Sequence, residues 1–139
     1  KAKAEAAQDQ TDIWAWFNAG TSSAKMEQWH DAAIYYDEAF RQGLPHRMLW
    51  YQFGPYETYY HLGRYNDVIE LANNTEETTE YVEETYYWRG MAYAALGRTD
   101  EALADLDRAI SFNPNYAAAP EAYTQIANGE YVAPAAPVD

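Results

Sequence analysis

Three histidines, His30, His46 and His61, are the residues that could most readily bind a metal ion. No two of them stand four positions apart, the spacing that places two ligands on one face of a helix. No serine lies in the sequence of a nucleophile elbow, and no glycine-rich phosphate loop occurs. The chain has no cysteine, which excludes disulfides, thiolate catalysis and thiolate metal sites. The residue types therefore predict a chain that is not an enzyme and has no metal site and no cofactor.

Carboxylates are abundant, and five glutamates gather at positions 76, 77, 80, 83 and 84 in a threonine-rich stretch. We interpret this stretch as a solvated connection between helices, because runs of like charge usually face water. The alternative is a contact with a basic partner or with weakly bound Ca²⁺.

The overall charge excludes two classes of partner. The chain has 22 Asp and Glu against 9 Lys and Arg, a formal net charge of −13. Phosphate backbones and anionic lipids are bound by clustered cations, so we expect no nucleic acid and no membrane partner. No apolar run approaches the ~20 residues that span a bilayer. The compartment stays open.

A seven-residue sequence motif recurs along the chain. Residues 62–68 read LGRYNDV, and residues 96–102, 34 positions later, read LGRTDEA. A looser copy precedes them, in which Trp29 stands 36 positions before Tyr65, so residues 42–45 are the place of a two-residue insertion. A period of this length predicts a stack of helical pairs.

The residues of the last unit resemble the tetratricopeptide repeat (TPR) family at its characteristic spacing: Tyr86, Gly90, Tyr93, Leu96, Gly97, Ala102, Ala109 and Pro114. The resemblance implies an all-α fold, a right-handed α-solenoid of three TPR repeats with a C-terminal capping helix. We place the TPR domain at 12–128, with repeats at about 13–46, 49–82 and 83–116 and the capping helix at about 117–128. Residues 1–11 are expected to be an N-terminal extension from a larger chain, and 129–139 an extended tail.

Within this scheme we expect helices at 12–25, 29–42, 47–62, 65–74, 81–96, 99–112 and near 117–128. Gly54-Pro55 then falls inside a helix, where proline removes one hydrogen bond and produces a kink. The kink either re-aims aromatic side chains for packing or widens a groove and frees a carbonyl for a ligand. In the helix at 99–112, the apolar positions recur at helical spacing and place Asp105, Asp107 and Arg108 on the opposite, outer face.

A closer resemblance is carried by residues 43–57, GLPHRMLWYQFGPYE. It is similar to the TPR region of bacterial multidomain proteins that carry a papain-like cysteine peptidase domain of the bacteriocin-processing type, and it extends loosely over residues 11–119. The resemblance implies an accessory region beside that peptidase-like domain. No nucleophile carries over, because the chain has no cysteine.

In TPR arrays the first helix of each pair lines the concave surface, and the resemblance assigns these groove residues: Trp14, Phe17, Thr21, Trp50, Phe53, Glu57, Tyr60, His61, Tyr87, Trp88 and Met91. Such a groove is aromatic and slightly acidic, which suits an apolar or proline-containing peptide. We therefore expect a protein–protein interaction scaffold that binds a peptide or protein segment. The alternative is a structural spacer or docking module for an adjoining domain, whose rings are core or are covered by that domain.

TPR domains that grip the C-terminal carboxylates of chaperones use Lys, Asn and Arg on this surface. The corresponding positions here hold Phe17, Thr21, Gly54, Glu84 and Trp88. A carboxylate clamp for chaperones is therefore not expected.

Overall fold

The computed structural model describes residues 12–79 and 82–137, and the expected N-terminal extension at 1–11 lies outside them. Within these ranges the chain is all-helical, without a strand. Its elements are α2 (Ile13–Lys25), α3 (Trp29–Arg41), the 3₁₀-helix η1 (His46–Trp50), α4 (Gly54–His61), α5 (Tyr65–Thr78), α6 (Glu83–Ala95), α7 (Thr99–Phe112) and α8 (Ala118–Ala127). No helix among the described residues is both long and apolar enough to cross a membrane.

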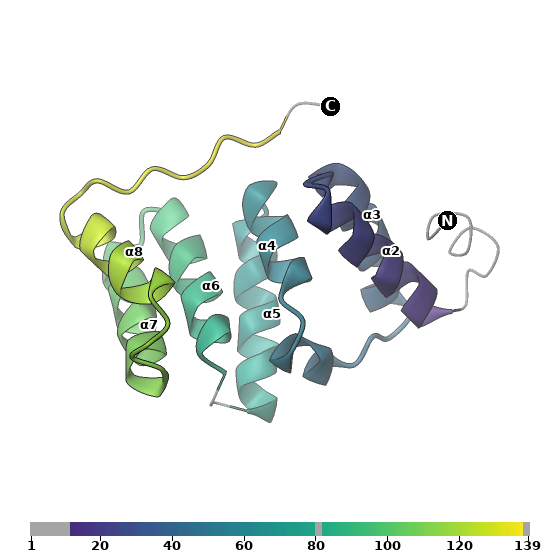
Figure 1. Cartoon of the computed structure of the whole chain (residues 1–139), viewed down its shortest axis with the longest axis horizontal. Coiled ribbons are helices and arrows are strands. Elements are labelled where there is room, and N and C mark those ends of the chain that lie inside the picture. Colours follow the sequence, from purple (N-terminus) through teal and green to yellow (C-terminus); the bar gives the residue numbers. More distant parts are fainter. Residues whose placement is uncertain (1–11, 80–81, 138–139) are drawn as a thin grey trace.

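The helices form three stacked pairs, α2 with α3, α4 with α5 and α6 with α7, and α8 covers the last pair (Figure 1). The second helix of each pair also packs on the first helix of the next. In addition, α2 contacts α4, α4 contacts α6, and α6 contacts α8. These four helices form one continuous layer of the solenoid, which we call the inner layer.

The repeat is visible in the backbone of the turns. Gly63 and Gly97 have φ of 77° and 78°, the left-handed conformation that favours glycine. Glu27 takes the same role in the first pair with φ of 55°. In each turn, the residue that follows the one with positive φ donates its N–H to the carbonyl five residues back, as Arg98 N does to Tyr93 O at 2.8 Å. The first turn thus keeps the repeat's geometry although Met26-Glu27 replaces Leu-Gly.

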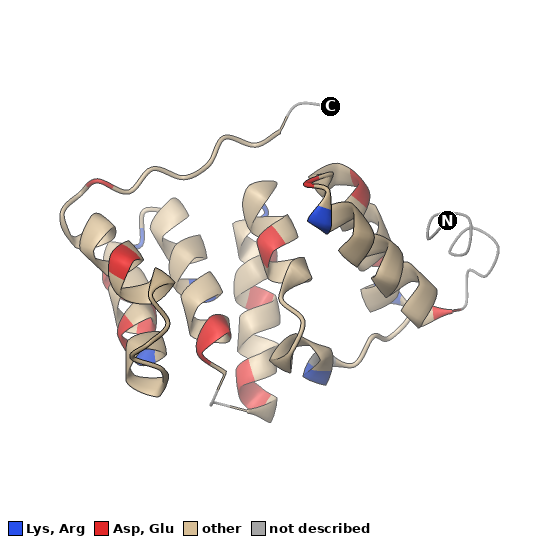
Figure 2. Ribbon diagram, in the orientation of Figure 1, with Lys and Arg blue, Asp and Glu red and all other residues tan. Residues whose placement is uncertain are grey.

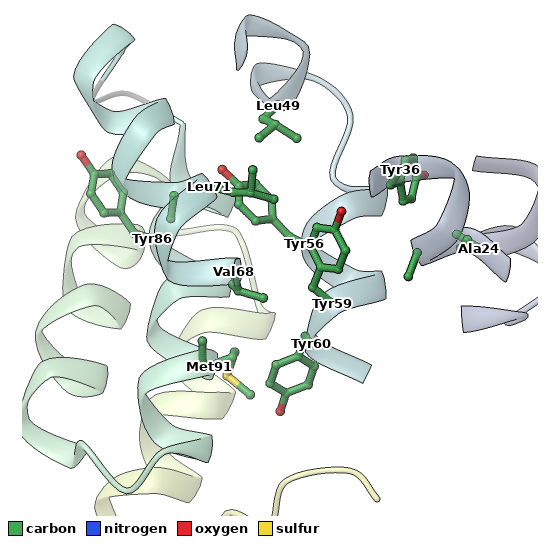
Figure 3. Close-up of a cluster of buried hydrophobic side chains, with 14 of the residues drawn as sticks. Ala24, Tyr36, Leu49, Tyr56, Tyr59, Tyr60, Val68, Leu71, Tyr86 and Met91 are labelled. Carbon is green, nitrogen blue, oxygen red and sulfur yellow. The ribbon is translucent and has the colours of Figure 1, made fainter. Parts of the chain in front are cut away.

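Small residues allow the helices of the first and third pairs to approach closely. A Cβ at Gly90 would lie 3.2 Å from the carbonyl oxygen of Ala102 and 3.1 Å from Leu106. At Gly20 it would lie 2.7 Å from the ring of Tyr36. Large side chains fill the space between pairs, and Figure 3 shows Tyr36, Tyr56 and Tyr59 among them.

The expected kinked helix at 47–62 is wrong. The chain forms η1, breaks at residues 51–53, and begins α4 at Gly54, so Pro55 lies in the first turn of a new helix. Proline is accepted there because the first N–H groups of a helix have no partner within it. Gly54 has a packing role as well, since a Cβ at this position would overlap the hydroxyl of Tyr36.

The helix α5 is longer than the expected 65–74, because its last turn is tied to its neighbours. The Thr75 hydroxyl donates to Leu71 O at 2.8 Å and accepts from the Tyr56 hydroxyl at 2.9 Å. Glu76 therefore belongs to a helix and not to a solvated connection, and its carboxylate accepts from Arg89 at 2.7 Å.

The outer-face position expected for Asp105 is also wrong, since its side chain is 1% exposed. Arg89, buried on α6, donates to Asp105 at 2.8 and 2.9 Å, and Arg108 donates to it at 2.7 Å. The same guanidinium of Arg89 reaches Glu76 and Asn73 on α5. This network links α5, α6 and α7.

Candidate functional site

Five aromatic rings follow one another across the inner layer and its edges. Tyr60 on α4 contacts Tyr65 at the start of α5 and Trp88 on α6, with ring centroids 5.8 and 5.5 Å apart. Trp88 is 5.1 Å from Tyr87, and Tyr87 is 5.4 Å from Tyr116, which precedes α8. We call Tyr60, Tyr65, Trp88, Tyr87 and Tyr116 the aromatic row. All but Tyr60 are half-buried, so each ring keeps one part accessible.

The helical repeat explains how the row is built. The helices α4 and α6 hold equivalent positions in successive pairs and are in contact, so rings on their shared face meet across the boundary. Tyr87 and Trp88, adjacent on α6, divide the contacts: Trp88 faces α4, and Tyr87 faces the chain before α8. One ring on α4 and two adjacent rings on α6 are thus enough for a continuous row.

Acidic side chains accompany the row. Burial raises the pKa of Tyr87, and the charges of Glu121 and Glu57 raise it further. Burial likewise raises the pKa of Tyr116, with the nearby Tyr87 hydroxyl and Glu84 adding to the effect. The pKa of Glu84 is itself raised, first by its own burial. Carboxylates from three helices therefore lie within electrostatic reach of the tyrosine hydroxyls.

Cations do not balance these acids. Arg89 is the one Lys or Arg within α4, α6 and α8, all of which are fully described, and it is buried against Asp105. Figure 2 shows Asp and Glu on all three helices. A positively charged or neutral apolar segment fits this surface better than an anion.

The structure brings five of the expected groove residues together: Glu57, Tyr60, His61, Tyr87 and Trp88. The four rings of this set form a chain of contacts: Tyr60 meets Trp88, Trp88 meets Tyr87, and His61 meets Tyr60 edge-on at 5.7 Å. His61 also stacks on Trp29 at 4.5 Å and so extends the aromatic surface toward the first pair.

The other expected groove residues lie elsewhere. Phe17 and Met91 are core residues, 4% and 8% exposed. Thr21 shares a hydrogen bond of 2.9 Å with the hydroxyl of Tyr36. Trp50, in η1, donates its Nε1 to Thr78 at the end of α5 at 3.1 Å.

Two more complete the set: Phe53 is partly buried just before α4, and Trp14 on α2 is 48% exposed. Sequence reasoning missed Tyr65 and Tyr116, because neither belongs to the first helix of a pair. Their signal is positional: Tyr65 follows the turn after α4, and Tyr116 lies between the end of α7 and the start of α8.

Comparison with known proteins agrees with this architecture. Residues 83–116, which hold α6 and α7, match the family model of the tetratricopeptide repeat. No curated protein sequence matches the chain. The TPR domain of OM64 from Arabidopsis shares 20% identity, covers 84% of this chain and 94% of that one, and has a TM-score of 0.74. The first TPR of Spaghetti (RPAP3), solved bound to the HSP90 peptide SRMEEVD, shares 20% identity, covers 87% and 94%, and has a TM-score of 0.73.

Proposed function

We propose that this α-solenoid, whose fold is that of TPR domains and whose third pair matches the TPR family model, is a non-catalytic protein–protein interaction scaffold. The aromatic row is the surface that binds a peptide or protein segment. The observation that carries the proposal is the continuity of these rings across two helical pairs and the cap. Rings that share one accessible surface bury a large area at a small entropy cost.

The chemistry of the row indicates how the segment is held. Contact with a chain of half-buried rings favours apolar or proline-containing residues, and Glu57, Glu84 and Glu121 disfavour an acidic segment. A clamp for a terminal carboxylate needs accessible cations near the row, and Arg89, the one Lys or Arg of α4, α6 and α8, is committed to Asp105 and Glu76. The similar Spaghetti domain holds a peptide, which supports peptide binding by this fold. We propose recognition without a carboxylate clamp.

A second candidate function is a docking module for an adjoining domain, peptidase-like if the closer sequence resemblance is right. The observation that favours it is the contrast between the two ends of the array. The last pair is covered by α8, whereas α2 in the first pair presents Trp14, 48% exposed. In this function the adjoining domain covers the first pair, and the aromatic row is not required.

The test is binding of peptides selected from a displayed random library against the full chain. Their Kd is then measured for the wild-type chain, Trp88→Ala, Tyr87→Ala and the control Tyr51→Ala. Tyr51 is 74% exposed in the break before α4, outside the row. We expect each row variant to lose about 2 kcal/mol of binding free energy, roughly 30-fold in Kd, and the control to lose nothing.

Circular dichroism first verifies that the variants keep their helices. If the folded row variants bind as tightly as the wild type, the row is not the binding surface. The same Kd is measured for Trp14→Ala, and loss of binding in this variant alone assigns the contact to the first pair and favours the docking function.

A further inference from the structure

The chain after α8 runs back along the array. Residues 130–137 have no regular secondary structure and extend from the cap toward the first pair (Figure 1). Tyr131, Pro134 and Pro137 are half-buried, as is Ala133, whereas Val132 is 84% exposed and positions 135 and 136 are exposed. The spacing of Tyr131, Pro134 and Pro137 is three residues, the period of a polyproline II helix. One face of this segment is therefore turned toward the domain.

Contacts near both ends of the segment hold it in place. The hydroxyl of Tyr131 shares a hydrogen bond of 2.5 Å with the hydroxyl of Tyr60 in the aromatic row. His30 Nε2, at the start of α3, donates to the carbonyl of Pro137 at 3.1 Å. The five residues between these contacts bring the segment from the second pair to the first, beside the stacked Trp29.

Tyr131 is inserted among the tyrosines of the row. Burial raises the pKa of Tyr60 and of Tyr131, and the hydroxyls of Tyr65 and Tyr87 act electrostatically on both. Tyr60 is 6% exposed, the least accessible ring of the row. The segment therefore occupies surface that a partner would use.

The contacts that hold residues 131–137 on the domain are ones that a segment of another chain can replace. Among the described residues, no backbone–backbone hydrogen bond joins residues 131–137 to the helices. The segment is instead held by one tyrosine hydroxyl, one histidine and the packing of the Tyr131 ring, with Pro134 and Pro137 half-buried. Because prolines fix the chain in an extended form, such a segment binds at a low conformational cost.

We propose that residues 130–137 are an intramolecular ligand of the aromatic row, and that the external partner is an extended segment of the same type. That partner has an aromatic residue followed by prolines at the third and sixth positions, and it binds by displacing residues 130–137. The proposal rests on the proposed function, because it names the class of segment that the row binds.

The test uses a synthetic peptide with the sequence of residues 130–137, EYVAPAAP, added to the full chain. In the variant Tyr131→Ala/Pro134→Gly the tethered segment loses its hydroxyl contact with Tyr60 and the proline that keeps it extended, so the row is open. A tethered segment has an effective concentration of about 1 mM. For a peptide Kd of about 0.1 mM in the open variant, the wild-type chain is expected to bind about tenfold more weakly.

The matched control is Val132→Ala, which changes a side chain pointing away from the domain and is expected to bind the peptide as the wild type does. The contact is located by NMR, through shifts of the Tyr60 and His30 amides. Tyr60→Phe in the open variant is expected to weaken the peptide several-fold, because the shared hydroxyl bond is lost.

Absence of saturable binding to the open variant at millimolar peptide would overturn the proposal, and so would equal binding to wild-type and open chains. Neither titration contains an external partner. A negative result therefore means that residues 130–137 are not a ligand of the row and do not resemble its external partner. The library experiment decides separately whether the row binds segments at all.

Discussion

The contact between Gly54 and Tyr36 predicts a coupled effect on stability. The ring of Tyr36 is fully buried, its hydroxyl bonds Thr21 at 2.9 Å, and it fills the place where a Cβ of residue 54 would be. Gly54→Ala therefore forces an overlap between the first and second pairs. Such overpacking costs about 1–3 kcal/mol, and helix propensity offsets little of it because Gly54 is the first residue of α4 and not an interior one.

Tyr36→Phe removes the atom that causes the overlap. By itself the change loses the hydrogen bond to Thr21, about 1 kcal/mol. In this background Gly54→Ala leaves only the Cζ contact at 3.1 Å, so its cost is expected to fall by about 1–2 kcal/mol. The pair of substitutions should thus be less destabilising than the sum of the single ones.

Urea unfolding followed by circular dichroism measures the four members of this cycle. The control background is Tyr59→Phe, which also loses a hydroxyl bond, to Asp37 at 2.7 Å, but leaves the Tyr36–Gly54 contact unchanged. Gly54→Ala should cost the same there as in the wild type. An unaltered cost of Gly54→Ala in the Tyr36→Phe chain, or no cost in any background, would refute the reasoning.

Three further changes follow from the same structure. Arg89→Met leaves the carboxylate of Asp105 buried with one partner and should cost about 3–5 kcal/mol in urea unfolding, most of which Arg89→Met/Asp105→Leu restores. Glu27→Gly should raise the free energy of unfolding by about 1 kcal/mol, because φ is 55° there, and a lowered urea midpoint would contradict this. Burial raises the pKa of Tyr36 to about 12, so the unfolded chain releases this proton near pH 10 while the folded chain retains it. Stability therefore falls as pH rises from 10 toward 12, and between pH 9 and 11 the wild type should lose about 1.4 kcal/mol more than Tyr36→Phe.

The helical pairs could be predicted from the sequence because their signals are local. The LGR phrases mark the turns at Gly63 and Gly97, and the small residues Gly90 and Ala102 mark the close approach of α6 and α7. Each depends on neighbours within one pair. The spacing alone was enough to order the pairs along the chain.

The features that the sequence concealed depend on contacts between distant segments. The burial of Asp105 follows from its ion pair with Arg89, 16 residues away on another helix. The sequence alone does not distinguish a buried, paired aspartate from an exposed one. In the sequence, Pro55 is compatible with a kink inside a helix or with the start of a helix. The structure has the helix start, in which Gly54 packs against Tyr36.

The candidate site shows the same division. Tyr87 and Trp88 could be placed from the repeat, because α6 holds a regular position in it. Trp50 could not, because η1 replaces the expected helix and directs its indole to Thr78. Tyr131 lies in a segment without helical periodicity, and only the folded array brings it to Tyr60.

The indole N–H signals of the five tryptophans test the central claim most directly. A library-selected peptide is titrated into the ¹⁵N-labelled full chain, with the signals assigned by single Trp→Phe substitutions. The account predicts that the Trp88 signal shifts in proportion to occupancy, while the signal of Trp50, bonded to Thr78 outside the row, does not move. A saturating peptide that leaves Trp88 unmoved and shifts Trp50 or Trp14 would contradict it.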